Sequence, residues 1–167
     1  LRQGVCGKKW TDNVYELNRL CCANEKNFAS EFVAKSMQML PKPTIVVSYA
    51  DTEQGHVGYV YQATNFLYTG LSTKFKDPKV KGLEHQHHAT YAHGLTNAEV
   101  IEKYGEDNVY FVERARKHRY VYILSKGGIR RKLMKTIKHP TFPYPKENEQ
   151  FVEEIIKMSP INLVESN

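Results

Sequence analysis

The chain has 167 residues, which is the length of a single domain and is enough to bury a hydrophobic core. Hydrophobic residues make up 41% and charged residues 25%, as in ordinary globular proteins, and no run approaches the roughly 18 apolar residues that a membrane-spanning helix needs. The net charge is +6, and residues 71–146 carry the excess, with 16 lysines and arginines against 7 acidic residues. Such a segment favours either a phosphate-rich partner or a solvated basic surface.

The first part of the chain predicts a strand, a helix and a second strand. Residues 13–20 alternate apolar and polar side chains, as a strand does. Residues 24–40 place apolar side chains three and four positions apart, which predicts an amphipathic helix. Residues 44–50, TIVVSYA, are typical of a strand buried on both faces. This order predicts a crossover unit whose two strands lie side by side in one sheet.

The start of the predicted helix is a candidate anion site. The first N–H groups of a helix have no internal partner and lie at the positive end of its dipole, which suits a pyrophosphate. Five residues would line such a site: Lys26, Asn27, Phe28, Ala29 and Ser30. The alternative is ordinary capping of the helix by an asparagine or serine side chain.

Next comes the stretch SYADTEQGHVGYVYQATNFLYTG, residues 48–70. It predicts a strand end at Asp51, a polar loop to Gly55, two helical turns over residues 56–64 and a short strand over residues 65–71. It therefore places a carboxylate, an imidazole and several phenols after one buried strand.

The second half of the chain is more polar. Residues 74–95 are rich in lysine, glycine and histidine and show no apolar period, so they predict a long surface loop. A short helix follows, with Thr96 as its N-cap and Gly105 at its end. Residues 108–125 predict two strands or a hairpin, with the charged segment ERARKHR between them, and residues 127–139 predict a basic helix. The proline-rich stretch that follows predicts a domain over residues 1–146 and a tail with a short helix over residues 147–167.

Several segments together resemble one family. YELNRLC, the 23-residue stretch above, and ERARKHRYVY followed by PYPK are similar to the Mom-type DNA adenine-modifying proteins of bacteriophages and prophages. The similarity runs from about Gly4 to Lys146. These proteins are divergent members of the acyl-CoA-dependent N-acetyltransferase (GNAT) superfamily, so the resemblance implies an α/β fold with a mixed sheet flanked by helices. Family members carry further sequence before this point, which implies either that this chain is cleaved or truncated, or that the first strands and helices come from another polypeptide.

The resemblance also implies an activity. The family converts the exocyclic N6 amine of adenine in DNA to a methylcarbamoyl amine, which shields phage DNA from restriction enzymes in the host cytoplasm. It implies iron and a donor related to acetyl-CoA. In the superfamily the pyrophosphate of coenzyme A lies on the helix after the fourth strand, which corresponds here to residues 26–30. Asn27 replaces the first glycine of the usual motif.

Adenine N6 is a poor nucleophile, so an enzyme must orient it and remove a proton. Asp51 is the candidate to accept a hydrogen bond from N6 or to act as a base, and its alternative role is to cap the loop. His56 is a candidate base or iron ligand, with a structural role as the alternative. Tyr61 lies in the region of the superfamily's general-acid tyrosine, although it could equally pack in the core. Tyr59 and Tyr68 are expected to pack.

The basic residues are candidates for contact with DNA phosphates. The set comprises Arg114, Arg116, Lys117, Arg119, Arg130, Arg131 and Lys132. A flipped adenine would need aromatic walls, for which Tyr91, Tyr120 and Tyr122 are candidates. The histidines of EHQHHATYAH could face DNA or solvent, or hold a metal. Two other functions stay open: an acetyltransferase acting on a protein or small-molecule amine, and a DNA-binding protein without catalysis.

Overall fold

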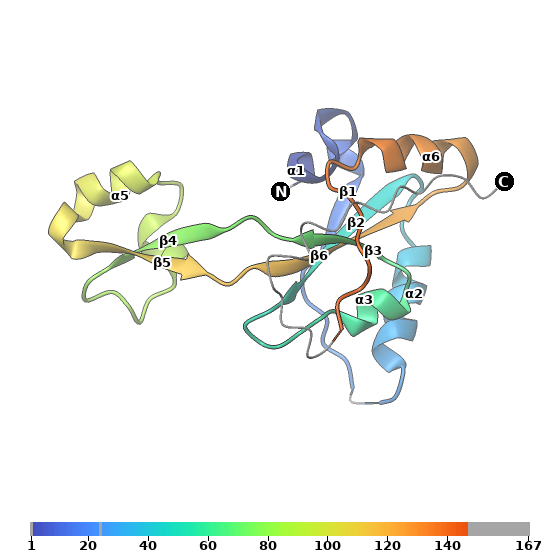
Figure 1. Cartoon of the computed structure of the whole chain (residues 1–167), viewed down its shortest axis with the longest axis horizontal. Coiled ribbons are helices and arrows are strands. Elements are labelled where there is room, and N and C mark those ends of the chain that lie inside the picture. Colours follow the sequence, from blue (N-terminus) through green and yellow to red (C-terminus); the bar gives the residue numbers. More distant parts are fainter. Residues whose placement is uncertain (1, 24, 147–167) are drawn as a thin grey trace. The chain divides into compact units, whose positions relative to one another are not determined.

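The computed structural model describes residues 2–23 and 25–146, and the chain forms two compact units (Figure 1). Unit 1 comprises Leu1–Ser72 and Lys117–Asn167, and unit 2 is the intervening segment Thr73–Arg116. The range 1–146, expected as one domain, therefore contains a separately packed insertion. The predicted tail, residues 147–167, lies outside the described residues.

A four-stranded mixed sheet forms the centre of unit 1. Its strands are β1 (Val14–Leu17), β2 (Thr44–Asp51), β3 (Leu67–Leu71) and β6 (Lys117–Leu124), in the order β1-β2-β6-β3. β1 and β2 are parallel, and their pairing ends with Leu17 opposite Ser48. β6 is antiparallel to both β2 and β3. The predicted strand–helix–strand unit with adjacent strands is therefore confirmed, and so is a mixed α/β fold.

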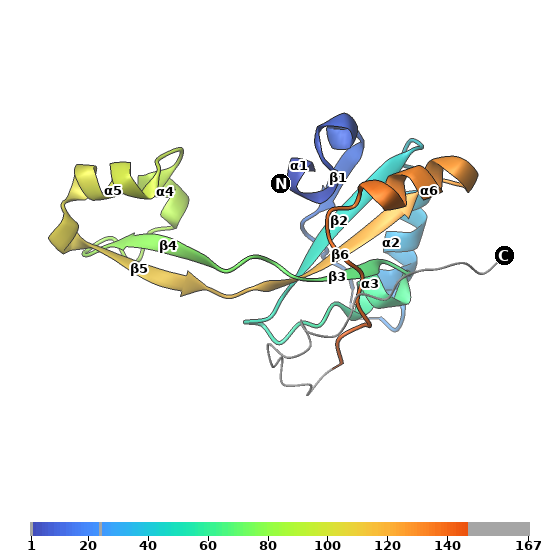
Figure 2. The same cartoon turned by 45° about the horizontal axis from the view of Figure 1, so that its top comes forward.

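Helices lie on both faces of this sheet (Figures 1 and 2). The helical elements of unit 1 are α1 (Arg2–Cys6), η1 (Lys8–Asn13), α2 (Phe28–Gln38), α3 (Tyr59–Ala63) and α6 (Gly127–Thr136). On one face, Val5 of α1 and Leu133 of α6 pack against the sheet, and on the other face Val33 of α2 does so. Within the described part of the chain, no helix is long and apolar enough to cross a bilayer.

The alternation of side chains along β2 assigns its residues to these two cores. Ile45 and Val47 pack on the face of α1 and α6, whereas Val46 and Ala50 pack on the face of α2 and α3. The continuous apolar run predicted a strand buried on both faces, and this packing confirms it.

Unit 2 is an antiparallel two-stranded ribbon with helices joined to one end. β4 (Phe75–Val80) pairs with β5 (Val109–Arg114), and α4 (His88–Ala92), α5 (Asn97–Tyr104) and η2 (Glu106–Asn108) connect them. Val80, Tyr91, Ala92 and Val100 form a small core of its own. Thr96 and Glu99 form the reciprocal capping box that starts α5, so the predicted N-cap is confirmed.

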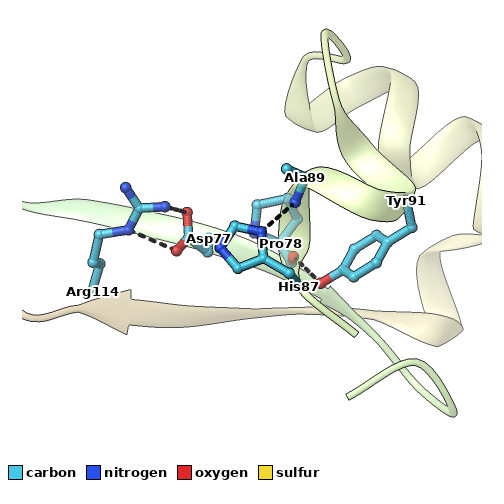
Figure 3. Close-up of polar contacts among 6 residues, drawn as sticks. All are labelled: Asp77, Pro78, His87, Ala89, Tyr91 and Arg114. Atoms are coloured by element: carbon cyan, nitrogen blue, oxygen red, sulfur yellow. Dashed lines mark hydrogen bonds and ion pairs between the residues drawn. The ribbon is translucent and has the colours of Figure 1, made fainter. Parts of the chain in front are cut away.

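Polar contacts attach α4 to β4 (Figure 3). The Tyr91 hydroxyl donates to the carbonyl of Pro78 at 3.1 Å, and His87 Nδ1 accepts from the N–H of Ala89 at 3.2 Å, which caps the helix. On the same ribbon, Arg114 donates twice to the carboxylate of Asp77, at 2.8 and 2.7 Å.

Two expectations for this region are wrong. Residues 74–95 are not a loop, because they contain β4 and α4. Residues 108–125 form two strands, which confirms one alternative of the prediction. The hairpin alternative is wrong, because β5 pairs with β4 whereas β6 lies in the other sheet, with only Ala115 and Arg116 between them. β4 lacks an apolar period because much of the ribbon is exposed to solvent. It is a strand because residues 29 to 39 positions later pair with it.

Candidate functional site

Asp51 stands at the carboxyl end of β2, beyond the last residue that pairs with β1. Its Oδ2 lies 3.0 Å from Nζ of Lys117, the residue opposite it on β6. Its Oδ1 accepts a hydrogen bond from the backbone N–H of Glu53 at 3.1 Å. The carboxylate therefore has both a cationic partner and the loop-capping role that was the alternative to function.

The environment keeps Asp51 ionised. Partial burial would raise the pKa of this carboxyl, but the hydrogen bond and charge of Lys117, the N–H of Glu53 and the nearby His56 together hold it below its usual value. A carboxylate with a lowered pKa is a weak base at neutral pH. It remains a strong hydrogen-bond acceptor, which suits it to orient an amine.

His56 lies close to Asp51 at the end of the same loop. Its backbone N–H donates to the carbonyl of Asp51 at 3.0 Å, and its side chain is exposed. Among the described residues, no group of three or more His, Cys, Asp or Glu side chains could hold a metal ion. The surroundings of His56, and equally the cluster of histidines in unit 2, therefore do not fit an iron site.

Tyr61 lies on the other face of the sheet. Its ring is 5.5 Å from that of Phe66 and 5.3 Å from that of Tyr120, in the core shared with α2. Its hydroxyl makes no hydrogen bond to any residue that the structure describes. Strand alternation directs the side chain of Asp51 to the face of α1 and α6. The structure thus brings Asp51 and His56 together, whereas Tyr61 approaches from the face of α2 and α3.

A buried network that was not predicted holds this region in place. The Tyr120 hydroxyl donates to the carbonyl of Val57. The side-chain amide of Gln62 donates to the same carbonyl at 3.0 Å, to the Tyr120 oxygen at 3.1 Å and to the carbonyl of Pro145 at 3.1 Å. The network joins the loop after His56, α3 and the PYPK segment. The repeated prolines of that segment were a signal, but nothing in the sequence identifies Gln62 as their partner.

The tyrosines differ from expectation in part. Tyr68 is 5% exposed, as predicted for a packing residue, whereas Tyr59 is 53% exposed and does not pack as expected. Tyr120 is fully buried, and Tyr91 is 6% exposed with its hydroxyl bound to Pro78. Neither of these two rings can stack on a flipped base without leaving a core. Tyr122 is half-buried beside Phe66.

A second buried polar pair lies next to the candidate site. The Tyr68 hydroxyl is 2.9 Å from Nδ1 of His118, whose side chain is 1% exposed. Burial lowers the pKa of His118 from 6.5 to about 4, so the imidazole is neutral in the folded protein at neutral pH. A neutral imidazole can accept the hydrogen bond of Tyr68.

This pair predicts a pH-dependent stability. Below the unfolded pKa of about 6.5, the unfolded chain protonates His118 whereas the folded protein does not, so stability is complete above that pH and falls as the pH approaches about 4. The full loss amounts to about 3 kcal/mol. Urea unfolding at several pH values should show that His118→Gln flattens this part of the profile. The matched variant of an exposed histidine, His93→Gln, should leave it unchanged. Equal profiles for wild type and His118→Gln would contradict the prediction.

The start of α2 keeps features of an anion site. Asn27 has φ 63° and ψ −5°, the left-handed conformation that glycine and asparagine adopt most readily. Its replacement of the expected glycine is therefore compatible with the backbone. Among the described residues no side chain caps the first turn, and the Ser30 hydroxyl instead donates to the carbonyl of Asn27 at 2.9 Å. The capping alternative is therefore wrong. Lys26 and Phe28 are exposed.

The basic residues occupy different environments. Arg119 is 8% exposed and donates to the side chain and carbonyl of Thr69 at 3.0 and 2.7 Å, so little of its charge can reach a phosphate. Lys117 forms an ion pair with Asp51, and Arg116 is half-buried. Arg130 donates to the carbonyl of Ile123 at 2.7 Å.

Arg131 and Lys132 on α6 are exposed. They belong to residues 117–146, which contain nine lysines and arginines and no acidic residue, whereas unit 2 contains seven of each. The whole charge excess of residues 71–146 therefore lies in the part of that range that belongs to unit 1.

Unit 1 is thus a mixed α/β structure with a polar candidate site at the end of β2 and a basic helix, α6. The chain belongs to the Mom protein family, whose model matches residues 2–146. This membership indicates a DNA modification protein of the phage Mom type. A comparison with curated proteins found no match.

Proposed function

We propose that the protein is an enzyme that converts the N6 amine of adenine in DNA to a methylcarbamoyl amine, meaning a carbamoylmethyl (–CH2–CO–NH2) substituent on N6, and so protects phage DNA from restriction in the host cytoplasm. The observation that carries the proposal is the ionised Asp51 carboxylate beside His56, at the end of β2 beyond its pairing with β1. It lies within the part of the chain that matches the Mom family.

Each residue has a distinct role in this proposal. Asp51 accepts a hydrogen bond from N6 and orients the amine, since its lowered pKa makes it a poor base. His56 is exposed beside it and takes the proton that N6 releases. Tyr61, whose hydroxyl is not engaged by any described residue, is proposed to donate a proton to the leaving group. It would do so from the face of α2 and α3, opposite the side chain of Asp51, with the donor lying where the β1–β2 pairing has ended.

The donor is proposed to be a coenzyme A compound related to acetyl-CoA that carries the carbamoylmethyl group, so that this group replaces one N6 hydrogen and coenzyme A leaves as its thiol. Acetyl-CoA itself would need a nitrogen-containing co-substrate, because its acyl group has no amide nitrogen. Its pyrophosphate would lie against the uncapped first turn of α2, where the backbone N–H groups of Ala29 and Ser30 and the side chain of Lys26 favour an anion. The element order β1, α2, β2, α3, β3 and the end of the β1–β2 pairing at Ser48 support a GNAT-like fold with parting strands. The outer edge of β1, which pairs with no other described strand, is proposed to pair with strands of a second polypeptide.

Nucleoside mass spectrometry tests the reaction. DNA from cells that express the full-length protein should yield a deoxyadenosine carrying one carbamoylmethyl group in place of a hydrogen, and DNA from control cells should not. Modification of protein amines without any change in DNA would instead support the acetyltransferase alternative. Binding of DNA without modification would support the non-catalytic alternative.

The exposed face of α6 predicts salt-dependent binding to DNA. Each phosphate that a lysine or arginine neutralises adds about 0.9 to the slope of log affinity against log salt. Arg131→Ala with Lys132→Ala should therefore lower the slope by about 2, measured by fluorescence anisotropy of a labelled duplex. The control, Lys35→Ala with Lys42→Ala, removes two exposed lysines elsewhere in unit 1. An unchanged slope in the α6 variant would show that these two side chains do not meet phosphates.

A further inference from the structure

The ribbon of unit 2 exposes more apolar surface than its small core explains. Phe75 is 53% exposed, and on β5 Tyr110, Phe111 and Val112 are 37%, 41% and 43% exposed. The core of unit 2 uses only the end of the ribbon where Val80 pairs with Val109. Large apolar side chains gathered on an exposed element mark a binding surface.

Pairing assigns these side chains to faces, because residues directly opposite on antiparallel strands lie on the same face. Val80 and Val109 face the helices, so the next rung, Lys79 with Tyr110, faces the other way. We name this second face the Phe75–Tyr110 face. Its members are Phe75, Asp77, Lys79, Tyr110, Val112 and Arg114.

Two contacts order this face. The guanidinium of Arg114 lies 5.5 Å from the centre of the Phe75 ring and donates to both carboxylate oxygens of Asp77 (Figure 3). The guanidinium of Arg114 thus neutralises the charge of the Asp77 carboxylate. Lys79 then remains as the cation opposite Tyr110 on this face.

Charge is divided sharply within unit 2. The ribbon and its roots, residues 73–81 and 109–116, contain six lysines and arginines against two acidic residues. The helical part, residues 82–108, contains one lysine against five acidic residues. Unit 2 therefore has a net charge of zero overall, but it consists of a basic ribbon and an acidic set of helices.

We infer that the Phe75–Tyr110 face of the ribbon docks in the major groove of duplex DNA. This rests on the proposed function and names how that enzyme would hold its substrate. A two-stranded ribbon fits the width of the major groove, where aromatic side chains contact thymine methyl groups. The basic ribbon complements the phosphates on either side, and the acidic helices stay outside the groove. A protein partner would not explain the basic charge of the ribbon as well as the phosphates of DNA do.

The test measures the affinity of the full chain for a labelled duplex by fluorescence anisotropy. Phe75→Ala with Tyr110→Ala should weaken binding about tenfold, and Lys79→Ala should lower the salt slope by about 1. Phe32→Ala is the matched control, because Phe32 is 51% exposed on α2 of unit 1. Lys103→Ala removes the one lysine of the helical part. Both controls should bind as wild type, and all variants should keep the wild-type melting temperature.

The outcomes separate this inference from the proposed function. If wild type and the ribbon variants bind DNA equally and with equal salt slopes, the ribbon does not dock on DNA, although α6 can still do so. If the ribbon variants bind normally but change the oligomeric state in light scattering, the face is a protein interface and the inference is overturned. If wild type shows no salt-dependent affinity for duplex DNA, the proposed function fails as well.

Discussion

Tyr61→Phe should remove most adenine modification and leave the fold intact. The change deletes only a hydroxyl that makes no hydrogen bond to the described residues, while the ring contacts with Phe66 and Tyr120 remain. Loss of a general acid typically lowers the rate by about 10²–10⁴-fold. Asp51→Asn and His56→Ala should have effects of similar size, because the amine would lose its acceptor or its base. Nucleoside mass spectrometry measures the modified fraction, and a melting curve reports the fold.

The structure offers a control on the same helix. Tyr59 is 53% exposed, and Tyr59→Phe removes a phenol hydroxyl without disturbing the core. This variant should modify DNA as well as wild type does. If Tyr61→Phe and Asp51→Asn are both folded and both retain near wild-type modification, these residues have only structural roles and the site is misassigned.

Gly58→Ala should be the most damaging small substitution in unit 1. Gly58 has φ +80°, and a Cβ built there would lie 2.5 Å from Cε2 of the buried Tyr120 ring. The left-handed conformation costs about 1–2 kcal/mol for a residue with a Cβ, and crowding a packed core costs about 1–3 kcal/mol more. A total of about 3 kcal/mol should lower the melting temperature by about 10 °C. Differential scanning calorimetry measures this shift.

Gly55→Ala separates the two causes. Gly55 also has a positive φ, +67°, but no atom lies within 4 Å of a Cβ at that position. This variant should therefore lose only about 1 kcal/mol, through backbone strain. Equal losses at the two positions would show that Tyr120 can move aside, and that its bonds to Val57 and Gln62 do not hold the ring.

Local patterns determined several parts of this protein correctly. The apolar spacing of α2, the β-branched run of β2 and the capping signal at Thr96 each act within one element, so the sequence alone predicts them. The adjacency of β1 and β2 followed from the order strand, helix, strand. The 23-residue stretch, with the segments around it, indicated the Mom family, and the family model over residues 2–146 confirms this.

The candidate site was predictable only in its residue types. The sequence placed Asp51 at a strand end, and the structure agrees. It began the helical turns at His56, whereas α3 begins at Tyr59 and leaves His56 in the preceding loop. It could not show that Lys117 pairs with Asp51 and lowers its pKa, because that contact depends on β6 lying beside β2. The packing of Tyr61 on the opposite face likewise depends on which core α3 joins.

Tertiary structure alone decided the rest. β4 has no apolar period and is a strand because β5 supplies its hydrogen bonds from 29 to 39 residues away. Successive strands β5 and β6 look like a hairpin in the sequence, yet each finds its partner elsewhere. Arg119 is basic and yet buried, because Thr69 satisfies its donors. A local sequence pattern reflects the interactions within one helix or strand. Strand pairing and burial instead depend on which distant segments of the chain pack beside that element.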